Sequence, residues 1–211
     1  MKNIADIRQE YTKSGLRESE LPCDPLSLFS RWLQEAIDVE EPTAVIVGTV
    51  SPEGRPSTRT VLLKGLHDGK FIFYTNYESR KGRQLAQNPY ISLSFVWHEL
   101  ERQVHIEGTA AKVSPEESDE YFKNRPYKSR IGARISPQSQ PIASRMQLIR
   151  AFVKEAARWL GKEVERPDNW GGYAVTPTRM EFWQGRPNRL HDRFLYTLKT
   201  DGKWEINRLS P

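Results

Sequence analysis

The chain of 211 residues contains a single cysteine, Cys23, which excludes an intramolecular disulfide and any multi-cysteine zinc or iron–sulfur site. This cysteine usage fits a reducing compartment, so the expected location is the cytoplasm. No apolar run reaches the roughly 18 residues that a membrane span needs. The N-terminal stretch MKNIADIRQEYTKSGL also lacks the apolar core of a secretory signal. Internal repeats and low-complexity segments are missing as well, which excludes a repeat architecture.

The familiar catalytic motifs are also missing. The sequence has no Gly-x-Ser-x-Gly, no His-Glu-x-x-His, no Gly-x-Gly-x-x-Gly and no P-loop. The acidic residues are scattered, so no acid/base pair can be chosen from them. Three of the four histidines, His67, His98 and His105, show no ligand spacing, and no metal site is expected. The residues alone therefore do not identify a reaction.

What is present is enough for one folded domain with an anionic partner. The hydrophobic fraction is 37%, and six Trp, eight Tyr and eight Phe supply aromatic mass for a β-rich core. The formal net charge of +5 points to nucleic acid, acidic lipid or small phosphorylated molecules. A merely solvated basic surface explains the charge equally simply, so the placement of the basic residues has to decide.

Hydrophobic patterning predicts an α+β fold, in which helices pack outside an antiparallel barrel. A helix begins at Asp24-Pro25, with an apolar stripe at Leu26, Phe29, Trp32, Leu33 and Ile37. Alternating or apolar runs predict strands at 43–50, 57–64, 70–76, 90–97 and 101–113. Further helices are expected after Ser114, at 129–135 and at 141–160, and strands return at 172–185, 192–199 and 203–211. Residues 1–20 are expected to be a mobile arm, and residues 21–211 a single domain that includes the C-terminal strands 172–211.

The first polar cluster combines a strand with the start of a helix. Arg59 and Lys64 lie five positions apart on one predicted strand, so they point to opposite faces and could simply be exposed. Arg80 and Lys81 stand where a strand gives way to a helix. Cations normally avoid the positive end of the helix dipole, so this placement predicts a shared anion, and we interpret it as a phosphate site.

The second cluster is Tyr121, Arg125 and Ser129, spaced by four residues each. All three side chains can donate to phosphate, and Arg can bind it bidentately. Pro126 leaves their geometry open, and spacing alone favours an ordinary polar helix face.

The side-chain amides of Gln138 and Gln103 do not by themselves indicate a function. Gln138-Ser139 lies in the polar loop SPQSQP, which is typical of a turn. Gln103 alternates with Val104, which places its side chain opposite the apolar face of its strand. There it is either solvated or positioned to hydrogen-bond a heteroaromatic ring in a barrel mouth.

The third cluster is EFWQGRPNRLHDR, residues 181–193. Trp183 offers a flat surface for stacking. Arg189, His191 and Arg193 alternate at what is expected to be a strand start, so they should point the same way. Crowding these charges costs free energy unless an anion or an electron-rich ring offsets it. The alternative is a lone satisfied histidine between two surface arginines.

Five segments in this order resemble the pyridoxamine 5′-phosphate oxidase family over nearly the whole chain. They are RTVLLK (59–64), FYTNYESRK (73–81), WHELERQV (97–104), SPQSQ (136–140) and EFWQGRPNRLHDRFLY (181–196). The resemblance implies an FMN-binding split β-barrel of the α+β class, antiparallel and Greek-key-like. It implies a homodimer with FMN at the subunit interface. It also implies oxidation of pyridoxamine or pyridoxine 5′-phosphate to pyridoxal 5′-phosphate, with hydride transfer from C4′ to the flavin and reduction of O2 to H2O2.

Site residues follow from the resemblance position by position. FMN contacts are implied at Arg59, Thr60, Val61, Leu62, Leu63, Lys64, Tyr74, Thr75, Arg80, Lys81, Gln103, Gln138, Ser139, Trp183 and Arg193. Substrate contacts are implied at Arg8, Tyr11, Lys64, Tyr121, Arg125, Ser129, Arg189 and His191. Of these, Arg189 and His191 would be catalytic, flanking the pyridine ring. Tyr11 and Arg8 would close over the substrate, so the N-terminal arm would be a lid.

The sequence departs from the family pattern at two positions, and two other functions are alternatives to the one that the resemblance implies. Glu41 stands where the family usually has Asp, and Val96 where proline is more common. A split barrel that holds a cofactor without oxidising B6 phosphates is one alternative, which the complete substrate set disfavours. A nucleic-acid-binding barrel is another. It is disfavoured because the basic residues form phosphate-sized groups and not a continuous stripe.

Overall fold

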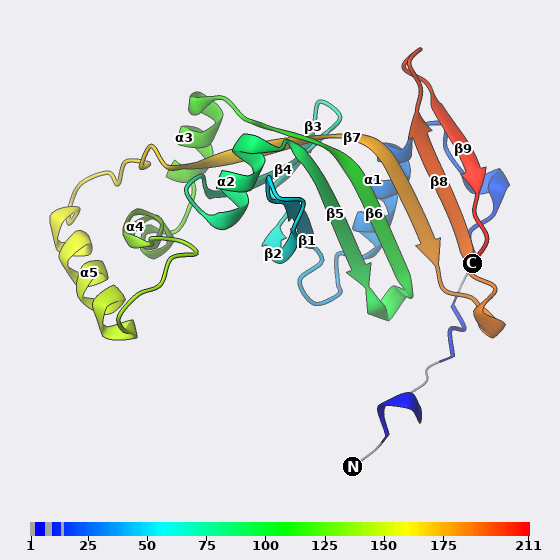
Figure 1. Cartoon of the computed structure of the whole chain (residues 1–211), viewed down its shortest axis with the longest axis horizontal. Coiled ribbons are helices and arrows are strands. Elements are labelled where there is room, and N and C mark those ends of the chain that lie inside the picture. Colours follow the sequence, from blue (N-terminus) through cyan, green and yellow to red (C-terminus); the bar gives the residue numbers. More distant parts are fainter. Residues whose placement is uncertain (1–2, 7–9, 14) are drawn as a thin grey trace.

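A computed structural model describes residues 3–6, 10–13 and 15–211, and within them nine strands form one antiparallel sheet (Figure 1). The strands are β1 (Ala44–Val50), β2 (Pro56–Leu62), β3 (Gly65–His67), β4 (Lys70–Asn76), β5 (Tyr90–Trp97), β6 (Arg102–Lys112), β7 (Trp170–Gln184), β8 (Asp192–Leu198) and β9 (Trp204–Arg208). Helices lie outside the sheet, so the predicted α+β class is confirmed.

Strand β7 belongs both to the barrel and to the part of the sheet that extends beyond it. The sheet order is β2-β1-β5-β6-β7-β4-β3, and β2 also contacts β4, which closes the barrel. Along one edge, β7 pairs first with β4, up to Val175, and then with β8, from Arg179 onward. Its other edge pairs with β6 throughout. The hairpin of β8 and β9 therefore extends the sheet beyond the barrel, and β7 runs from the side of α3 to this hairpin (Figure 1).

The core of the barrel consists of side chains from alternate strand residues and from the buried face of one helix. On β5, Ile91, Leu93 and Phe95 are buried, as the alternation predicted. Helix α1 (Pro25–Glu35) begins where expected, because the Asp24 carboxylate accepts the backbone N–H groups of the first turn. Phe29 of this helix packs edge-on against Phe95 at 4.9 Å, so α1 closes one side of the core.

Four further α-helices complete the layer outside the sheet: α2 (Arg80–Gln87), α3 (Pro115–Lys123), α4 (Tyr127–Ile135) and α5 (Arg145–Arg158). Short 3-10 turns are η1 (Ile4–Asp6), η2 (Glu18–Glu20), η3 (His98–Leu100) and η4 (Pro187–Arg189). In the described part of the chain, no helix is long and apolar enough to cross a membrane. A small second core of Phe122, Ile131, Val164 and Trp170 holds α3 and α4 near the start of β7.

Three details of the helices differ from the predictions. The helix expected at 129–135 begins two residues earlier, at Tyr127, directly after Pro126. The helix expected at 141–160 is α5, which begins four residues later and ends two residues earlier, and none of its residues is fully buried. Phe152 and Ala156 pack against the second core, whereas Met146 is 52% exposed. In α1, Leu28 is fully buried, while Ile37 lies beyond the helix and is 52% exposed.

The prediction that Arg189, His191 and Arg193 alternate on one strand is wrong. Strand β8 begins only at Asp192, and Arg189 ends the turn η4. Asn188 and Arg189 both adopt left-handed backbone, with φ of 57° and 61°. The chain therefore turns sharply before β8, and the three side chains are brought together by this turn and not by strand alternation.

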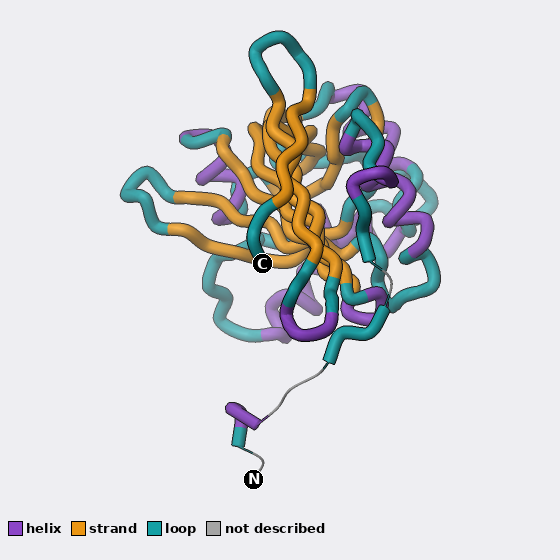
Figure 2. Tube along the Cα trace, turned by 90° about the vertical axis from the view of Figure 1, so that its right-hand side faces the viewer, coloured by secondary structure: helices purple, strands orange, loops and turns teal. Residues whose placement is uncertain are grey.

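The N-terminal part of the chain joins the body near the C-terminal strands. Residues 3–6 lie away from the body, whereas Leu16 is 4% exposed and belongs to the main core (Figure 2). The division into an arm of residues 1–20 and a domain of residues 21–211 stays a prediction.

Candidate functional site

Three cations gather where β2 meets the start of α2. Arg59 lies on β2, while Arg80 and Lys81 form the first turn of α2, which Ser79 caps by accepting the N–H of Gly82. Burial and the charge of Arg80 lower the pKa of Arg59. Among the described residues, none of the three cations forms an ion pair with a carboxylate. Such a group is stabilised when an anion binds between its members.

Lys81 is the most buried of these cations, at 7% exposed. Its ammonium donates to the Thr75 hydroxyl at 2.8 Å and to the Gln138 amide oxygen at 3.0 Å. Burial, and then the charge of Arg59, lower the pKa of Lys81 to about 8. Gln138 comes from the loop after α4, so residues far apart in the sequence meet at this ammonium.

Neutral oxygens hold the Arg59 guanidinium in place. It donates to the Thr49 hydroxyl at 2.5 Å and to the Ser57 hydroxyl at 2.8 Å. Both hydroxyls in turn donate to the side-chain oxygen of Gln84 on α2, at 2.6 and 3.0 Å. This chain of hydrogen bonds fixes Arg59 against α2 without neutralising its charge. Sequence reasoning missed Gln84, because no local pattern marks it.

An aromatic stack forms around Tyr74, the residue before Thr75 on β4. Tyr74 stacks on Tyr121 with ring centroids 3.7 Å apart, and Trp170 continues the stack at 5.6 Å from Tyr74. The Arg125 guanidinium lies over the Trp170 ring at 4.4 Å, and its buried Nη1 has no hydrogen-bond partner among the described residues. Burial lowers the pKa of Arg125. A buried guanidinium nitrogen without an acceptor is costly, and an anionic oxygen would satisfy it.

We call the cations and the aromatic stack together the cation group. Its members are Arg59, Tyr74, Thr75, Arg80, Lys81, Tyr121, Arg125 and Gln138.

A separate set of residues, the ring group, lies at the other end of β7. Its members are Tyr11, Gln103, Trp183, Arg189, His191 and Arg193. Gln103, Trp183 and Arg193 are paired in register across β6, β7 and β8. Gln103 lies opposite the buried Val104 side, as predicted. Arg193 also donates to Glu181 at 2.8 Å.

His191 is the titratable centre of the ring group. Its ring lies 4.6 Å from the Trp183 ring, and its Nδ1 accepts the backbone N–H of Arg186 at 3.1 Å. A neutral imidazole that accepts at Nδ1 carries its proton at Nε2, so Nε2 is a donor. Burial, and then the charges of Arg189 and Arg193, lower the pKa of His191, which favours this neutral form.

The two groups lie far apart within one chain. Thr75 of the cation group pairs with Gly171 of β7, whereas Gln103 of the ring group pairs with Trp183 of the same strand. Twelve residues of strand at about 3.3 Å each separate these rows by roughly 40 Å along β7. A small ligand that contacts Thr75 therefore cannot also contact Gln103 of the same chain.

The remaining predicted residues lie near these groups with fewer contacts. On β2, Thr60 and Leu62 point outward, Val61 is half-buried, and Leu63, just past the strand, is buried. Lys64 and Ser129 are exposed, and Ser139 is exposed with left-handed backbone at φ 67°. Arg8 lies outside the described residues. Glu41, the unusual acidic residue, is exposed on a left-handed turn before β1.

Two family models match this chain. The family model described as pyridoxamine 5′-phosphate oxidase matches residues 33–162. A second model, described as the pyridoxine 5′-phosphate oxidase C-terminal dimerisation region, matches residues 170–211. The second match contains β7, β8 and β9, and with them most of the ring group.

Curated relatives and solved structures point the same way. A pyridoxine/pyridoxamine 5′-phosphate oxidase of Bacteroides thetaiotaomicron is 98% identical, with 100% of both chains covered. One of Porphyromonas gingivalis W83 is 58% identical over 99% of both chains. Among solved structures, PhzG from Burkholderia lata 383, crystallised with tetrahydrophenazine-1-carboxylic acid, superposes with a TM-score of 0.87. It is 31% identical, and the match covers 92% of this chain and 95% of PhzG.

Proposed function

This chain belongs to the pyridoxamine 5′-phosphate oxidase family, and on that premise we propose that it converts pyridoxamine or pyridoxine 5′-phosphate to pyridoxal 5′-phosphate. FMN is its cofactor, and O2 is reduced to H2O2. The cytoplasm remains the expected location. When bound, FMN supplies the redox chemistry by accepting a hydride from the substrate carbon. The protein contributes binding, orientation and electrostatics.

The observation that carries the proposal is a pair of anion sites within the cation group. FMN and the substrate each bring one phosphate. Arg59, Arg80 and Lys81 gather without a carboxylate partner, and they fit the FMN phosphate. Arg125, with its unpartnered buried Nη1, fits the substrate phosphate, and Tyr121 lies beside it. Lys64 and Ser129 would complete the substrate site from their exposed positions.

The ring group offers hydrogen-bonding and charged side chains to the pyridine ring of the substrate. His191, neutral and protonated at Nε2, offers a hydrogen-bond donor to the oxygen or nitrogen on the pyridine ring. Arg189 is exposed and free to turn toward an anionic ring substituent, and Trp183 with Gln103 would contact the flavin ring system. Arg193 would help to place the flavin while its pair with Glu181 holds its position.

We propose further that each complete site is shared between two subunits. The match to the dimerisation region supports a homodimer. Roughly 40 Å of β7 separates Thr75 from Gln103 of one chain, too far for one FMN molecule to contact both. A partner subunit that brings its ring group to the cation group would close the site, and two-fold symmetry would then create two such sites.

The purified protein should therefore be yellow, and it should form pyridoxal 5′-phosphate and peroxide from pyridoxamine 5′-phosphate. A visible absorption spectrum and a coupled peroxide assay measure both properties. A colourless protein that stays inactive after FMN is added would contradict the proposal.

The lowered pKa of Lys81 predicts how FMN affinity depends on pH. In the apoprotein Lys81 titrates at about 8, and a bound phosphate raises this pKa because it stabilises the ammonium. Above pH 8, FMN binding then requires proton uptake, so affinity should fall by up to about tenfold per pH unit. Flavin-fluorescence titration of the apoprotein between pH 7 and 9.5 measures this slope.

The matched control is Lys81→Arg, which stays charged over the whole range. Its FMN affinity should be nearly independent of pH between 7 and 9.5. The assignment of Lys81 to the FMN phosphate fails if the wild-type affinity is equally flat, or if both proteins show the same slope.

A further inference from the structure

A strap of N-terminal chain, residues 10–13 and 15–16, crosses the ring group. The Tyr11 ring lies 5.5 Å from the Trp183 ring and 5.6 Å from the His191 ring, edge-on to both. Gly185 lies directly beneath it, since a Cβ there would come within 2.8 Å of Tyr11 Cγ. Tyr11 therefore covers the two rings of its own chain that face the substrate.

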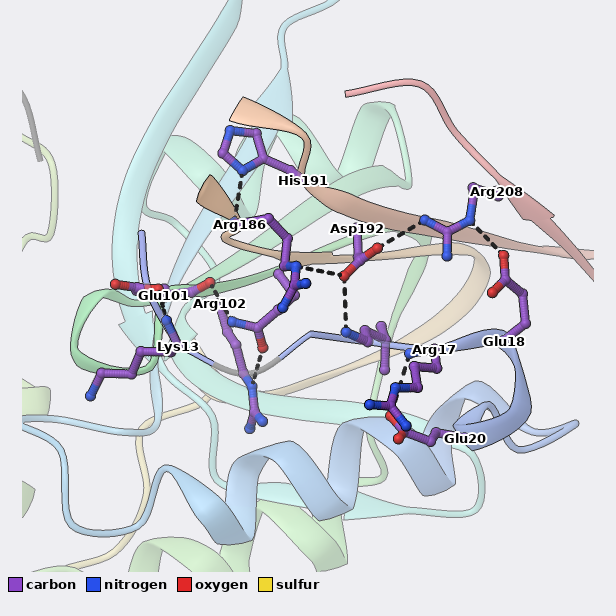
Figure 3. A network of polar contacts seen from close by, with 12 residues as sticks. Lys13, Arg17, Glu18, Glu20, Glu101, Arg102, Arg186, His191, Asp192 and Arg208 are labelled. Atoms are coloured by element: carbon purple, nitrogen blue, oxygen red, sulfur yellow. Dashed lines mark hydrogen bonds and ion pairs between the residues drawn. The ribbon is translucent and has the colours of Figure 1, made fainter. Parts of the chain in front are cut away.

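Two carboxylates hold the backbone of this strap (Figure 3). The N–H groups of Thr12 and Lys13 donate to Glu101, at 3.3 and 3.0 Å, and each carboxylate oxygen accepts one of them. The N–H of Leu16 donates to Asp192 at 3.1 Å. Within the described residues of the strap, these three are the backbone N–H groups that have hydrogen-bond partners. The described strap thus lacks strand or helix pairing of its own, and it is held by these two anchors and by the packing of Leu16 in the main core.

Glu101 is a firmly placed anchor. It is 6% exposed and adopts left-handed backbone, with φ 54°, at the turn between β5 and β6. Its carbonyl accepts the N–H of Gly185 at 2.8 Å and the amide of Gln184 at 3.2 Å, which ties it to the end of β7. Asp192 differs, because Arg186 and Arg208 also pair with it. In the described chain the Glu101 carboxylate pairs with no cation, so its charge is directed at the strap.

We propose that Glu101 is a positioning residue, which acts through the strap by holding Tyr11 closed over His191 and Trp183. Charge-assisted hydrogen bonds to two adjacent N–H groups favour the closed strap, and Tyr11 then shields the pyridine ring of the bound substrate from water. The inference rests on the proposed function, because it assigns the substrate ring to this place. It predicts that the anchor affects substrate capture and not FMN binding.

The test is Glu101→Gln in the FMN-loaded enzyme. The amide keeps the shape of the side chain but offers one oxygen, so its NH2 group must face one of the strap N–H groups. We expect KM for pyridoxamine 5′-phosphate to rise about tenfold, while kcat and the FMN dissociation constant change less than about twofold. Hydrogen exchange at Thr12 and Lys13 should accelerate. Glu99→Gln, on the exposed side of the same turn, is the matched control and should change none of these values.

A double-mutant cycle separates positioning from a general structural effect. Tyr11→Ala should raise KM by itself, and adding Glu101→Gln to it should then change KM less than about twofold. An unchanged KM in Glu101→Gln would overturn the inference, and so would a full tenfold effect that persists in the Tyr11→Ala background.

If Glu101→Gln folds poorly, a second variant tests the same inference. Lys13→Pro removes one donor from the exposed strap and should raise KM in the same way. An unchanged KM in Lys13→Pro overturns the inference too. An inactive wild type would reject the proposed function, whereas the exchange at Thr12 and Lys13 still tests the anchor.

Discussion

Mixed dimers of Arg125→Ala and Arg189→Ala, assayed at a substrate concentration below the wild-type KM, should regain about a quarter of the wild-type turnover, although each variant alone is nearly inactive there. The reason is the separation of the cation group, which holds Arg125, from the ring group, which holds Arg189. If a site takes one group from each subunit, every mixed dimer contains one intact site and one site with both defects. Half of the dimers are mixed after random exchange, so a quarter of all sites are intact. Co-refolding equimolar variants, followed by the peroxide assay, measures the recovery.

The control for this experiment pairs two variants from the same group. Arg125→Ala mixed with Lys81→Ala should give no recovery, because each mixed dimer then carries one defect in each site. Arg189 is well suited to the other half of the experiment, because it is exposed and its removal leaves the core unchanged. Recovery near zero in the first mixture would show that each chain builds its own site.

Arg125→Ala alone should lower kcat/KM for pyridoxamine 5′-phosphate by about 100-fold, mostly through KM. Its buried Nη1 has no acceptor in the structure, so a phosphate oxygen would gain a charge-assisted hydrogen bond there. The loss of such a contact to a charged group costs up to about 3 kcal/mol, and about 1.4 kcal/mol corresponds to tenfold. Steady-state kinetics measure the effect, and the FMN absorbance of the purified variant should match that of the wild type.

Lys123→Ala provides the matched control for this substitution. Lys123 is an exposed cation at the end of α3, two residues before Arg125, so its removal changes the net charge equally without touching the aromatic stack. Its kcat/KM should stay within about twofold of the wild-type value. A drop in kcat/KM of equal size in both variants would mean that Arg125 acts through the overall field of the protein and not through a phosphate contact.

Local features of the fold were predictable because they depend on neighbours in the sequence. The caps at Asp24 and Ser114 and the alternation on β5 follow from hydrogen bonding and burial within a few residues. The turn before β8 was not predictable in this way. Asn188 and Arg189 adopt left-handed backbone, and no glycine marks the position. A regular alternation of charged residues therefore looked like a strand.

The candidate site was predictable as a set of residues but not as an arrangement. Resemblance places Lys81 and Gln138 in one site, and their contact at 3.0 Å depends on the loop after α4 folding back over α2. Trp170, which supports Arg125, lies far away in the sequence and carries no local sign of its role. Helix α5 shows the same limit. Its spacing predicts a helix, but spacing alone does not tell that Phe152 packs against the second core while Met146 is exposed.

The length of β7 has a consequence for how this protein behaves on dilution. On the proposed sharing of sites, an isolated subunit would be unable to assemble one, because Thr75 and Gln103 lie roughly 40 Å apart along this strand. Specific activity should then depend on protein concentration by mass action, and it should fall below the dissociation constant of the dimer. FMN that bridges two subunits would also oppose their separation, so flavin supply would set how much of the protein exists as dimer in dilute solution.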